Sequence, residues 1–434
     1  MNKMKITDIP WLPEISEDFL VGYVKQYFCI SKDLSKEGEP ERVLKLARTG
    51  IVEKDVTTNV GQMAASYAGY NKVQVGDLLL NPMDLYSGAN CNVAELNGVI
   101  SPAYANLRAK APHTIVPKFY DYYFKSQYWI MAMFAHGKGV SFDNRWTLNN
   151  DSLRTYEIPV APYAVQQRIV ECIQADEKKV NILIENVQTQ IEKLKAYKQS
   201  LITKVVTKGL DKNVAMKDSG VEWIGSIPAH WGIAKLQYCA KIRSGITLGK
   251  TYPAGTELVE RPYLRVANVQ SGGVVLDSLK TINVTATEES QYSLSVGEVL
   301  MTEGGDRDKL GRGCVWQGQV DPCLHQNHIF ALKTNDLLDP YFLSYVTASD
   351  IGRTYFDITA TKTTNLACTN SSKVLAFRHP LPEIGEQQMI VSFLNEKCDQ
   401  IDRLISIKQA KIEKLEQYKR SLIYEYVTGK KEVF

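Results

Sequence analysis

Two stretches of this chain place a mostly apolar residue at alternating spacings of four and three, and no proline interrupts them. The first series is Val180, Ile184, Val187, Ile191, Leu194, Lys198, Leu201 and Val205. The second is Ile401, Ile405, Lys408, Ile412, Leu415, Lys419, Leu422 and Tyr426. This alternation is typical of a coiled-coil seam, because it keeps these side chains on one face of a helix. Each stretch predicts a helix of about 45 residues, which is ~65 to 70 Å long at a rise of ~1.5 Å per residue.

The two stretches are copies of one another. Residues 166–209 align without a gap with residues 387–430 at an offset of 221, and eleven of the seventeen positions between Ile191 and Thr207 are identical to their counterparts. Unrelated sequences would share roughly one such position, so the chain contains an internal repeat. A long helix with an apolar stripe needs a partner, and we expect each copy to pair with the other. The long segment between them allows the two helices to run antiparallel.

The segments that precede the two helices also share an order of features. Each opens on a tryptophan, Trp11 or Trp223, which we interpret as a buried aromatic anchor. Each continues with a strand-like run, VQVGDLLL at 73–80 or SVGEVLM at 295–301, and then with an aromatic segment of helical character at 117–134 or 339–356. Short strand patterns, turns and one helix in each segment predict an α+β fold.

Proline-containing hinges separate each globular segment from its long helix. They are IPVAP at 158–162 and HPLP at 379–382, and a proline shortly before a periodic segment is typical of a helix start. The predicted organisation is a first globular domain at 1–158, a first long helix at 159–210, a second globular domain at 211–378 and a second long helix at 379–434. The predicted fold class is therefore α+β, with a pseudo-twofold internal repeat and an intramolecular antiparallel coiled coil.

Composition and charge narrow the class of protein only a little. The chain has 434 residues, of which 44% are hydrophobic and 23% charged, and a net charge of +3, which permits contact with a polyanion without requiring it. Its eight cysteines are scattered without a C-x-x-C pair, as expected of free thiols in a reducing compartment. The first residues lack the apolar stretch of a signal peptide, and no apolar run approaches the ~20 residues that cross a bilayer. We therefore expect a cytoplasmic protein.

Further motifs carry a family resemblance. They are GVEWIGSIPAHW at 220–231, GRGCVW and CLHQNHIF within 311–330, NPMDL at 81–85, GVISPAY at 98–104, and the QQ and IEKL motifs of the two long helices. With them, essentially the whole chain resembles the DNA-specificity subunits of type I restriction-modification systems. The first opening segment departs from the pattern, with Ser16 and Asp18 where the second copy has Pro228 and His230.

The resemblance implies a function. Each globular domain is expected to be a target-recognition domain that reads one half of a split, asymmetric site in double-stranded DNA. The paired helices are expected to set the spacing of the half-sites and to dock two methyltransferase subunits, which restriction subunits join in the full complex. The resemblance implies no catalytic, cofactor-binding or metal-binding residues in this chain, with S-adenosylmethionine, ATP and Mg on the partner subunits. Two unlike domains on a rigid spacer would suit two unlike half-sites.

Contacts with DNA are expected from basic and amide side chains in polar loops. In the second domain the best loops are GGDRDKLGRG at 304–313 and TATKTTN at 359–365. An exposed loop side chain without a ligand is the alternative interpretation of each candidate. The DNA-binding candidates are Asn81, Arg108, Lys110, Asn144 and Arg145 in the first domain, and Arg307, Lys309, Arg312, Lys362 and Asn365 in the second.

Several motifs resemble catalytic or metal sites without completing them. The run Asn81 to Asp84 lacks the second proline and the aromatic residue that an amino-methyltransferase uses to hold a flipped base. His325 and His328 lack a third ligand, so zinc is not expected. No phosphate-binding G-x-x-x-x-G-K-[ST] motif occurs. These gaps disfavour the alternative function, a stand-alone DNA methyltransferase or other DNA-modifying enzyme. A structural coiled-coil protein without a nucleic-acid role is a third hypothesis.

Overall fold

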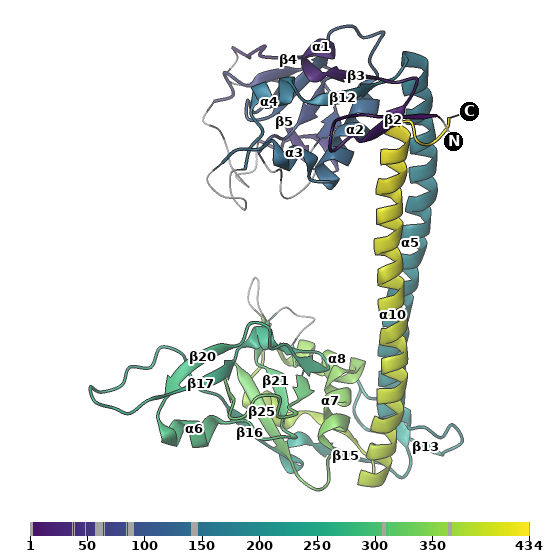
Figure 1. Cartoon of the computed structure of the whole chain (residues 1–434). Coiled ribbons are helices and arrows are strands. Elements are labelled where there is room, and N and C mark those ends of the chain that lie inside the picture. Colours follow the sequence, from purple (N-terminus) through teal and green to yellow (C-terminus); the bar gives the residue numbers. More distant parts are fainter. Residues whose placement is uncertain are drawn as a thin grey trace. The chain divides into compact units, whose positions relative to one another are not determined.

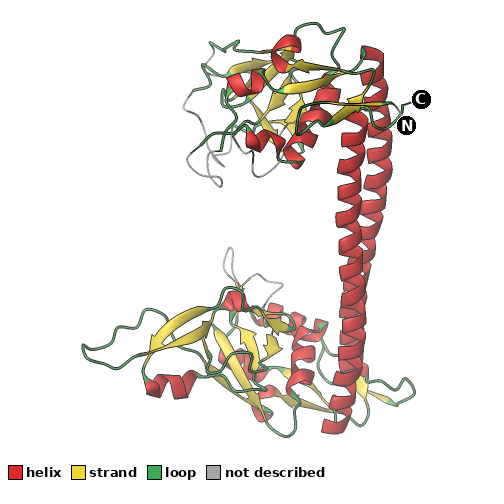
Figure 2. Ribbon diagram, viewed as in Figure 1, coloured by secondary structure: helices red, strands yellow, loops and turns green. Residues whose placement is uncertain are grey.

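The computed structural model divides into two compact units. Unit 1 comprises Met1–Gln188 and Ala410–Phe434, and unit 2 comprises Thr189–Gln409. Each unit combines a globular part of sheets and short helices with segments of two long helices (Figure 1, Figure 2). The structure describes residues 3–36, 38, 40–47, 49–56, 64, 66–83, 85, 91–139, 146–305, 310–311, 313–362 and 367–433.

The globular part of unit 1 is built on a four-stranded antiparallel sheet in the order β4-β11-β8-β9. The strands are β4 (Phe28–Ile30), β8 (Leu78–Leu80), β9 (Cys91–Val93) and β11 (Ala105–Ala109), and helix α2 (Pro117–Trp129) packs against β8 and β9. Leu78 and Leu80 join the core that contains α2, whereas Leu79 joins a second cluster with Leu44 and Leu46. Successive side chains of a strand point to opposite faces, so an uninterrupted leucine run suits a strand that is covered on both sides.

Shorter elements surround this sheet. Four antiparallel pairs accompany it: β1 (Met4–Ile6) with β2 (Glu14–Ser16), β3 (Leu20–Tyr23) with β12 (Glu157–Val160), β5 (Leu44–Ala47) with β6 (Gly50–Glu53), and β7 (Asn71–Val73) with β10 (Gly98–Ile100). The short helices are α1 (Val24–Tyr27), α3 (Ala132–Ala135) and α4 (Asn150–Arg154).

Unit 2 has a four-stranded antiparallel sheet in the order β16-β25-β21-β23. Its strands are β16 (Ala240–Ser244), β21 (Val299–Thr302), β23 (Gly313–Val315) and β25 (Ile329–Thr334), and helix α7 (Pro340–Ala348) packs against β21 and β23. The remaining strands are β13 (Met216–Asp218), β14 (Ser226–Pro228), β15 (Gly232–Lys235), β17 (Val259–Leu264), β18 (Val269–Gln270), β19 (Gly273–Val274), β20 (Lys280–Val284), β22 (Gly304–Gly305), β24 (Leu324–His325), β26 (Thr361–Lys362), β27 (Ala367–Cys368) and β28 (Arg378–Leu381). The remaining short helices are α6 (Ala286–Tyr292), α8 (Asp350–Thr359) and α9 (Ser371–Ala376), with 3-10 turns at Leu236–Tyr238 and Val266–Asn268.

The two units repeat one topology. In the main sheets β4 corresponds to β16, β11 to β25, β8 to β21 and β9 to β23, since both orders and all strand directions agree. The pair β15-β28 repeats the pair β3-β12, and β13-β14 repeats β1-β2. The duplicated α+β fold predicted from the sequence is therefore confirmed.

The aromatic segments differ from the single helices that the sequence predicts. In unit 1, α2 ends at Trp129, and Met131 adopts a left-handed conformation with φ of 60° before α3 begins. In unit 2, Ser349 is extended and separates α7 from α8. There the start of α8 is fixed by tertiary contact, because the backbone N–H of Asp350 donates to the hydroxyl of Thr203 at 2.9 Å. Periodicity alone does not reveal such breaks.

Two long helices run through the fold, α5 (Tyr163–Lys208, 46 residues) and α10 (Ile384–Val427, 44 residues). Every seam position named from the sequence is buried or partly buried in both copies. The long helices and their seam are therefore as predicted. Among the residues that the structure describes, no helix has both the length and the apolarity to cross a membrane.

Within each unit the two helices run antiparallel. In unit 1 the Lys419 ammonium donates to Asn181 at 3.1 Å, and the Tyr426 hydroxyl donates to Asp176 at 2.9 Å, so later residues of α10 meet earlier residues of α5. In unit 2 the same direction holds, because Lys198 pairs with Asp402 at 2.6 Å, and Lys408 donates to Gln190 at 2.5 Å. The seam lysines lay their stems along the interface and reach a polar atom of the facing helix, as amphipathic side chains do.

One repeated glutamine joins each long helix to its globular part. Gln166 near the start of α5 is fully buried; its amide nitrogen donates to the carbonyls of Thr114 and Ala161, and its oxygen accepts from Val116 N–H at 2.9 Å. Gln387 near the start of α10 is equally buried and makes the same three bonds, to the carbonyls of Leu337 and Pro382 and from Asp339 N–H. Val116 and Asp339 are the N-cap residues of α2 and α7, so each glutamine ties a long helix to the start of a domain helix.

Candidate nucleic-acid interface

The ten DNA-binding candidates fall into two groups. Asn81, Arg108 and Lys110 lie in described parts of unit 1, and Lys362 is the second residue of strand β26 in unit 2. The others lie outside the described residues: Asn144, Arg145, Arg307, Lys309, Arg312 and Asn365. The role of each candidate stays a prediction.

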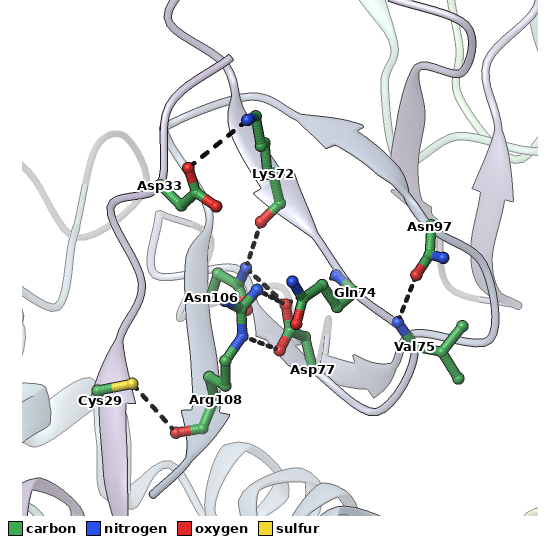
Figure 3. Close-up of polar contacts among 9 residues, drawn as sticks. All are labelled: Cys29, Asp33, Lys72, Gln74, Val75, Asp77, Asn97, Asn106 and Arg108. Carbon is green, nitrogen blue, oxygen red and sulfur yellow. Dashed lines mark hydrogen bonds and ion pairs between the residues drawn. The ribbon is translucent and has the colours of Figure 1, made fainter.

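Arg108 on β11 is clamped by a buried carboxylate (Figure 3). Its Nε lies 2.7 Å from Asp77 Oδ1, and a terminal nitrogen lies 2.7 Å from Asp77 Oδ2. The side chain of Asp77 is 3% exposed and also accepts from the Asn106 amide at 3.0 Å. The hydrogen bonds that Arg108 donates to Asp77 raise the pKa of Arg108 above its ordinary value. An arginine recognises guanine through a bidentate pair of hydrogen bonds. In Arg108 two of the guanidinium nitrogens already form such a pair with Asp77.

Unit 2 contains a counterpart of this clamp that the sequence does not reveal. Glu298 follows Gly297 in the strand-like run that matches the run around Asp77, and the turn glycines Gly76 and Gly297 have φ of 90° and 89°. Glu298 accepts from Arg243 at 3.1 and 2.6 Å. This arginine comes from β16, which corresponds to β4, whereas Arg108 comes from β11. The repeated acidic residue is the sequence signal that could have indicated this ion pair. Which arginine it binds depends on the tertiary structure.

Asn81 and Lys110 are held in different ways. Asn81 is buried, and its carboxamide oxygen accepts from the backbone N–H of Met83 at 3.0 Å, which fixes the turn after β8. Lys110 is exposed and follows β11, and its ammonium donates to the carbonyl of Lys25 at 2.6 Å. Of these two, only Lys110 is charged, and it is exposed to solvent.

The two candidate loops of unit 2 each contain a strand of one small sheet. Strand β22, at the start of the segment 304–313, pairs with β27, and β27 pairs with β26, which lies in the segment 359–365. Strands β22 and β26 therefore flank β27 in one small sheet, although more than fifty residues separate them in the sequence. That the two loops form one DNA interface stays a prediction.

A histidine and a glutamate lie at the base of these loops. His328 Nδ1 is 2.6 Å from Glu303 Oε2, and the backbone N–H of Glu303 donates to the carbonyl of His328. Thr369, just after β27, donates its N–H to the carbonyl of Glu303 at 2.8 Å. His325 is buried, and burial lowers its pKa to about 4, so its ring is neutral near pH 7. In the described part of the chain no group of three or more His, Cys, Asp or Glu side chains could hold a metal ion.

Large apolar side chains remain exposed at equivalent positions of the long helices. Leu183 on α5 and Leu404 on α10 are 49% and 47% exposed, and Tyr197 and Tyr418 are 58% and 54% exposed. Each pair is related by the offset of 221, and each residue directly precedes a seam position. Positions that flank a coiled-coil seam commonly set the choice of partner. The repeat thus presents the same kind of surface twice.

Comparison with known proteins agrees with the family resemblance. The type I restriction enzyme MjaVIII specificity subunit of Methanocaldococcus jannaschii is 23% identical over 426 residues, which cover 95% of this chain and 87% of that protein. A second specificity-subunit relative from the same organism, MjaX, is 23% identical over 208 residues, about half of each chain, at 47% of both. No family model matches the chain.

A solved structure shares the fold. A chain from a structural study of complex assembly and conformational transition in a type I restriction-modification system superposes with a TM-score of 0.69 at 16% identity, over 95% of this chain and 98% of that one. The resemblance to type I specificity subunits predicted from the sequence is therefore confirmed over nearly the whole length. The comparisons support a DNA-specificity role and point to a subunit that is not itself catalytic.

Proposed function

We propose that this chain is the DNA-specificity subunit of a type I restriction-modification complex and recognises a bipartite, asymmetric site in double-stranded DNA. The observation that carries the proposal is the repetition of one sheet topology in two units, each attached to a copy of the same long helix. A protein with two reading domains on one repeated scaffold binds two half-sites, as paired domains do in dimeric DNA-binding proteins.

The two half-sites differ in sequence. The scaffold is repeated, but its side chains are not: the clamp of Arg108 by Asp77 in unit 1 becomes a clamp of Arg243 by Glu298 from another strand in unit 2. The candidate loops 304–313 and 359–365 of unit 2 likewise have no matching sequence in unit 1. Base readout depends on such side chains, so unlike domains select unlike bases.

Two methyltransferase subunits dock on the helices. The exposed Leu183, Tyr197, Leu404 and Tyr418 supply equivalent apolar surfaces on both copies of the repeat, which suits two copies of one partner. Restriction subunits join this core in the full complex. S-adenosylmethionine, ATP and Mg belong to those partners, and this chain supplies recognition and assembly in the cytoplasm.

Mapping of methylated adenines tests this function. Cells that express this chain with its methyltransferase subunit should methylate a split motif with a fixed gap of unspecified bases, and cells with the methyltransferase alone should not. Methylation of a short continuous motif would contradict the proposal. Methyl transfer by the purified chain alone would instead support a stand-alone enzyme.

A further inference from the structure

A basic hollow lies on unit 1, beside strand β4 and helix α4. It has a volume of about 340 Å³, and its lining includes Lys25, Lys32, Lys110 and Arg154. All four are exposed. Asp151 is the acidic residue of the lining, so positive charge predominates. Three segments distant in sequence, at 25–32, 110 and 150–154, therefore bring four cations to one place.

No carboxylate of the described residues forms an ion pair with any of these four cations. Lys110 donates to the carbonyl of Lys25, and the Lys25 ammonium lies 5.5 Å from the centre of the Tyr23 ring. The bond to the Lys25 carbonyl holds Lys110 in place without neutralising it. Four cations and one carboxylate, that of Asp151, line the hollow, so its net charge is positive and attracts an anion.

Unit 2 shows that the scaffold does not need this charge. The backbone of Lys110 donates to the carbonyl of Tyr27 at 2.9 Å, and that of Asn335 donates to the carbonyl of Cys239 at 2.9 Å, so Lys110 corresponds to Asn335. Ile30 pairs with Leu107 as Ile242 pairs with Leu332. Asn149 caps α4 through the N–H of Ser152 just as Asn370 caps α9 through that of Lys373. The hollow and its surroundings therefore have an aligned internal counterpart.

At the aligned positions of unit 2 the four cations are absent. Their counterparts are Gln237 for Lys25, Ser244 for Lys32, Asn335 for Lys110 and Leu375 for Arg154. Among the positions that line the hollow, Lys241 in place of Cys29 is the cation gained, and Ser372 replaces Asp151. Since the same backbone folds with neutral residues at all four positions, the charges of unit 1 serve something other than folding.

We infer that the basic hollow of unit 1 binds a phosphate group. Lysine and arginine are the side chains that bind phosphate through charge and hydrogen bonds, and the convergence of four of them from three segments fits a compact anion. The phosphate has two chemical sources, a free phosphate compound or the backbone of DNA, and the site is a property of the first domain alone.

The test exchanges side chains between the four positions of unit 1 and the four aligned positions of unit 2, in the full chain. The neutral variant carries the residues of unit 2, as Lys25→Gln, Lys32→Ser, Lys110→Asn and Arg154→Leu. The transplanted variant carries the reverse changes in unit 2, as Gln237→Lys, Ser244→Lys, Asn335→Lys and Leu375→Arg. A control removes four exposed lysines of unit 1 elsewhere, as Lys138→Gln, Lys178→Gln, Lys411→Gln and Lys414→Gln.

Thermal unfolding with inorganic phosphate, against potassium chloride at equal ionic strength, gives the first readout. A ligand at ten times its dissociation constant raises the folded-to-unfolded ratio about elevenfold, so phosphate should raise the melting temperature of the native chain and the control. The neutral variant should lose this rise, and the transplanted variant should gain a larger one. Equal phosphate responses in all four proteins would overturn the inference, whether or not the neutral variant is less stable.

Duplex DNA binding at several salt concentrations gives the second readout and identifies the source. If the hollow takes a backbone phosphate, the neutral variant should lose about 0.9 from the slope of log affinity against log salt for each contact removed, with base preference unchanged. If only the phosphate response is lost and the slope is kept, the ligand is a free phosphate compound. The first readout contains no DNA, so it stands even if the proposed DNA-specificity role fails.

Discussion

Gln166 and Gln387 show why a repeated side chain need not be a ligand contact. Each is fully buried and saturates three backbone groups, at the point where a long helix leaves its globular part. The neighbouring Gln167 and Gln388 are exposed, although both belong to the same repeated pair. The sequence marks the pair as repeated, but only burial distinguishes the structural member from the exposed one.

Replacement of the buried glutamine should weaken the fold in either unit. Gln166→Ala and Gln387→Ala should each lower the free energy of unfolding by about 1 to 3 kcal/mol or more, because buried backbone groups are left without hydrogen-bond partners. Chemical unfolding followed by circular dichroism and hydrogen exchange measures the loss. The matched controls Gln167→Ala and Gln388→Ala should change stability by less than about 0.5 kcal/mol. Equal losses for buried and exposed positions would refute this assignment.

Arg108 and Lys110 separate two kinds of candidate that look alike in sequence. Both are basic residues at the end of one strand, yet Arg108 pairs with a buried aspartate and Lys110 carries its charge at a solvent-facing hollow. The sequence could select polar and basic residues near turns. It could not show which of them already had a partner, because Asp77 lies 31 residues away and meets Arg108 only through strand pairing.

The long helices α5 and α10 are predicted directly by the spacing of their apolar residues. A stripe repeating every three and four residues fixes one buried face, and the same register appears in both copies. The exposed leucine and tyrosine beside the seam are a second layer of information on those helices. They do not contribute to the seam, and the proposed docking of two copies of one partner would account for their repetition.

Charged substitutions on this surface should remove methyltransferase subunits one at a time. Tyr197→Glu or Tyr418→Glu should reduce the number of bound methyltransferase subunits from two to one, and the double variant should bind none, because a charge is costly at an apolar interface. Native mass spectrometry counts the subunits. Ala196→Glu and Gln417→Glu place the same charge at exposed neighbouring positions and should keep both. Retention of two subunits by the double variant would exclude these tyrosines from the interface.

The boundaries of the two compact units cross both long helices. Each compact unit contains a globular part together with segments of both α5 and α10, and the boundaries between units fall inside the helices, at Gln188 and Gln409. The domain limits predicted from the sequence, near residues 158 and 378, separate each globular part from the long helix that follows it. The compact units instead include segments of both long helices with each globular part. Residues inserted at these two points therefore lengthen the helical segments that connect the two globular parts.

Insertion of one heptad at both points should alter the recognised gap without altering the bases. Seven residues after Gln188 and seven after Gln409 keep the seam in phase and add about 10 Å of helix, or roughly three base pairs of DNA. Methylation mapping should show a longer gap or no methylation, with each half-site unchanged. The same seven residues inserted between Lys212 and Asn213, in an exposed turn, should leave the gap as it was. New bases in either half-site would contradict the spacer role.

The internal repeat, the two long helices, their seam and the α+β character of the other parts could all be predicted from the amino-acid order. These features depend on periodicity and on local backbone preference, which the order of residues carries directly. Three other features follow from the folded chain: the breaks at Met131 and Ser349, the arginine that each acidic turn residue binds, and the gathering of Lys25, Lys32, Lys110 and Arg154. These depend on which strands become neighbours, and contacts between residues far apart in the chain leave no local signal.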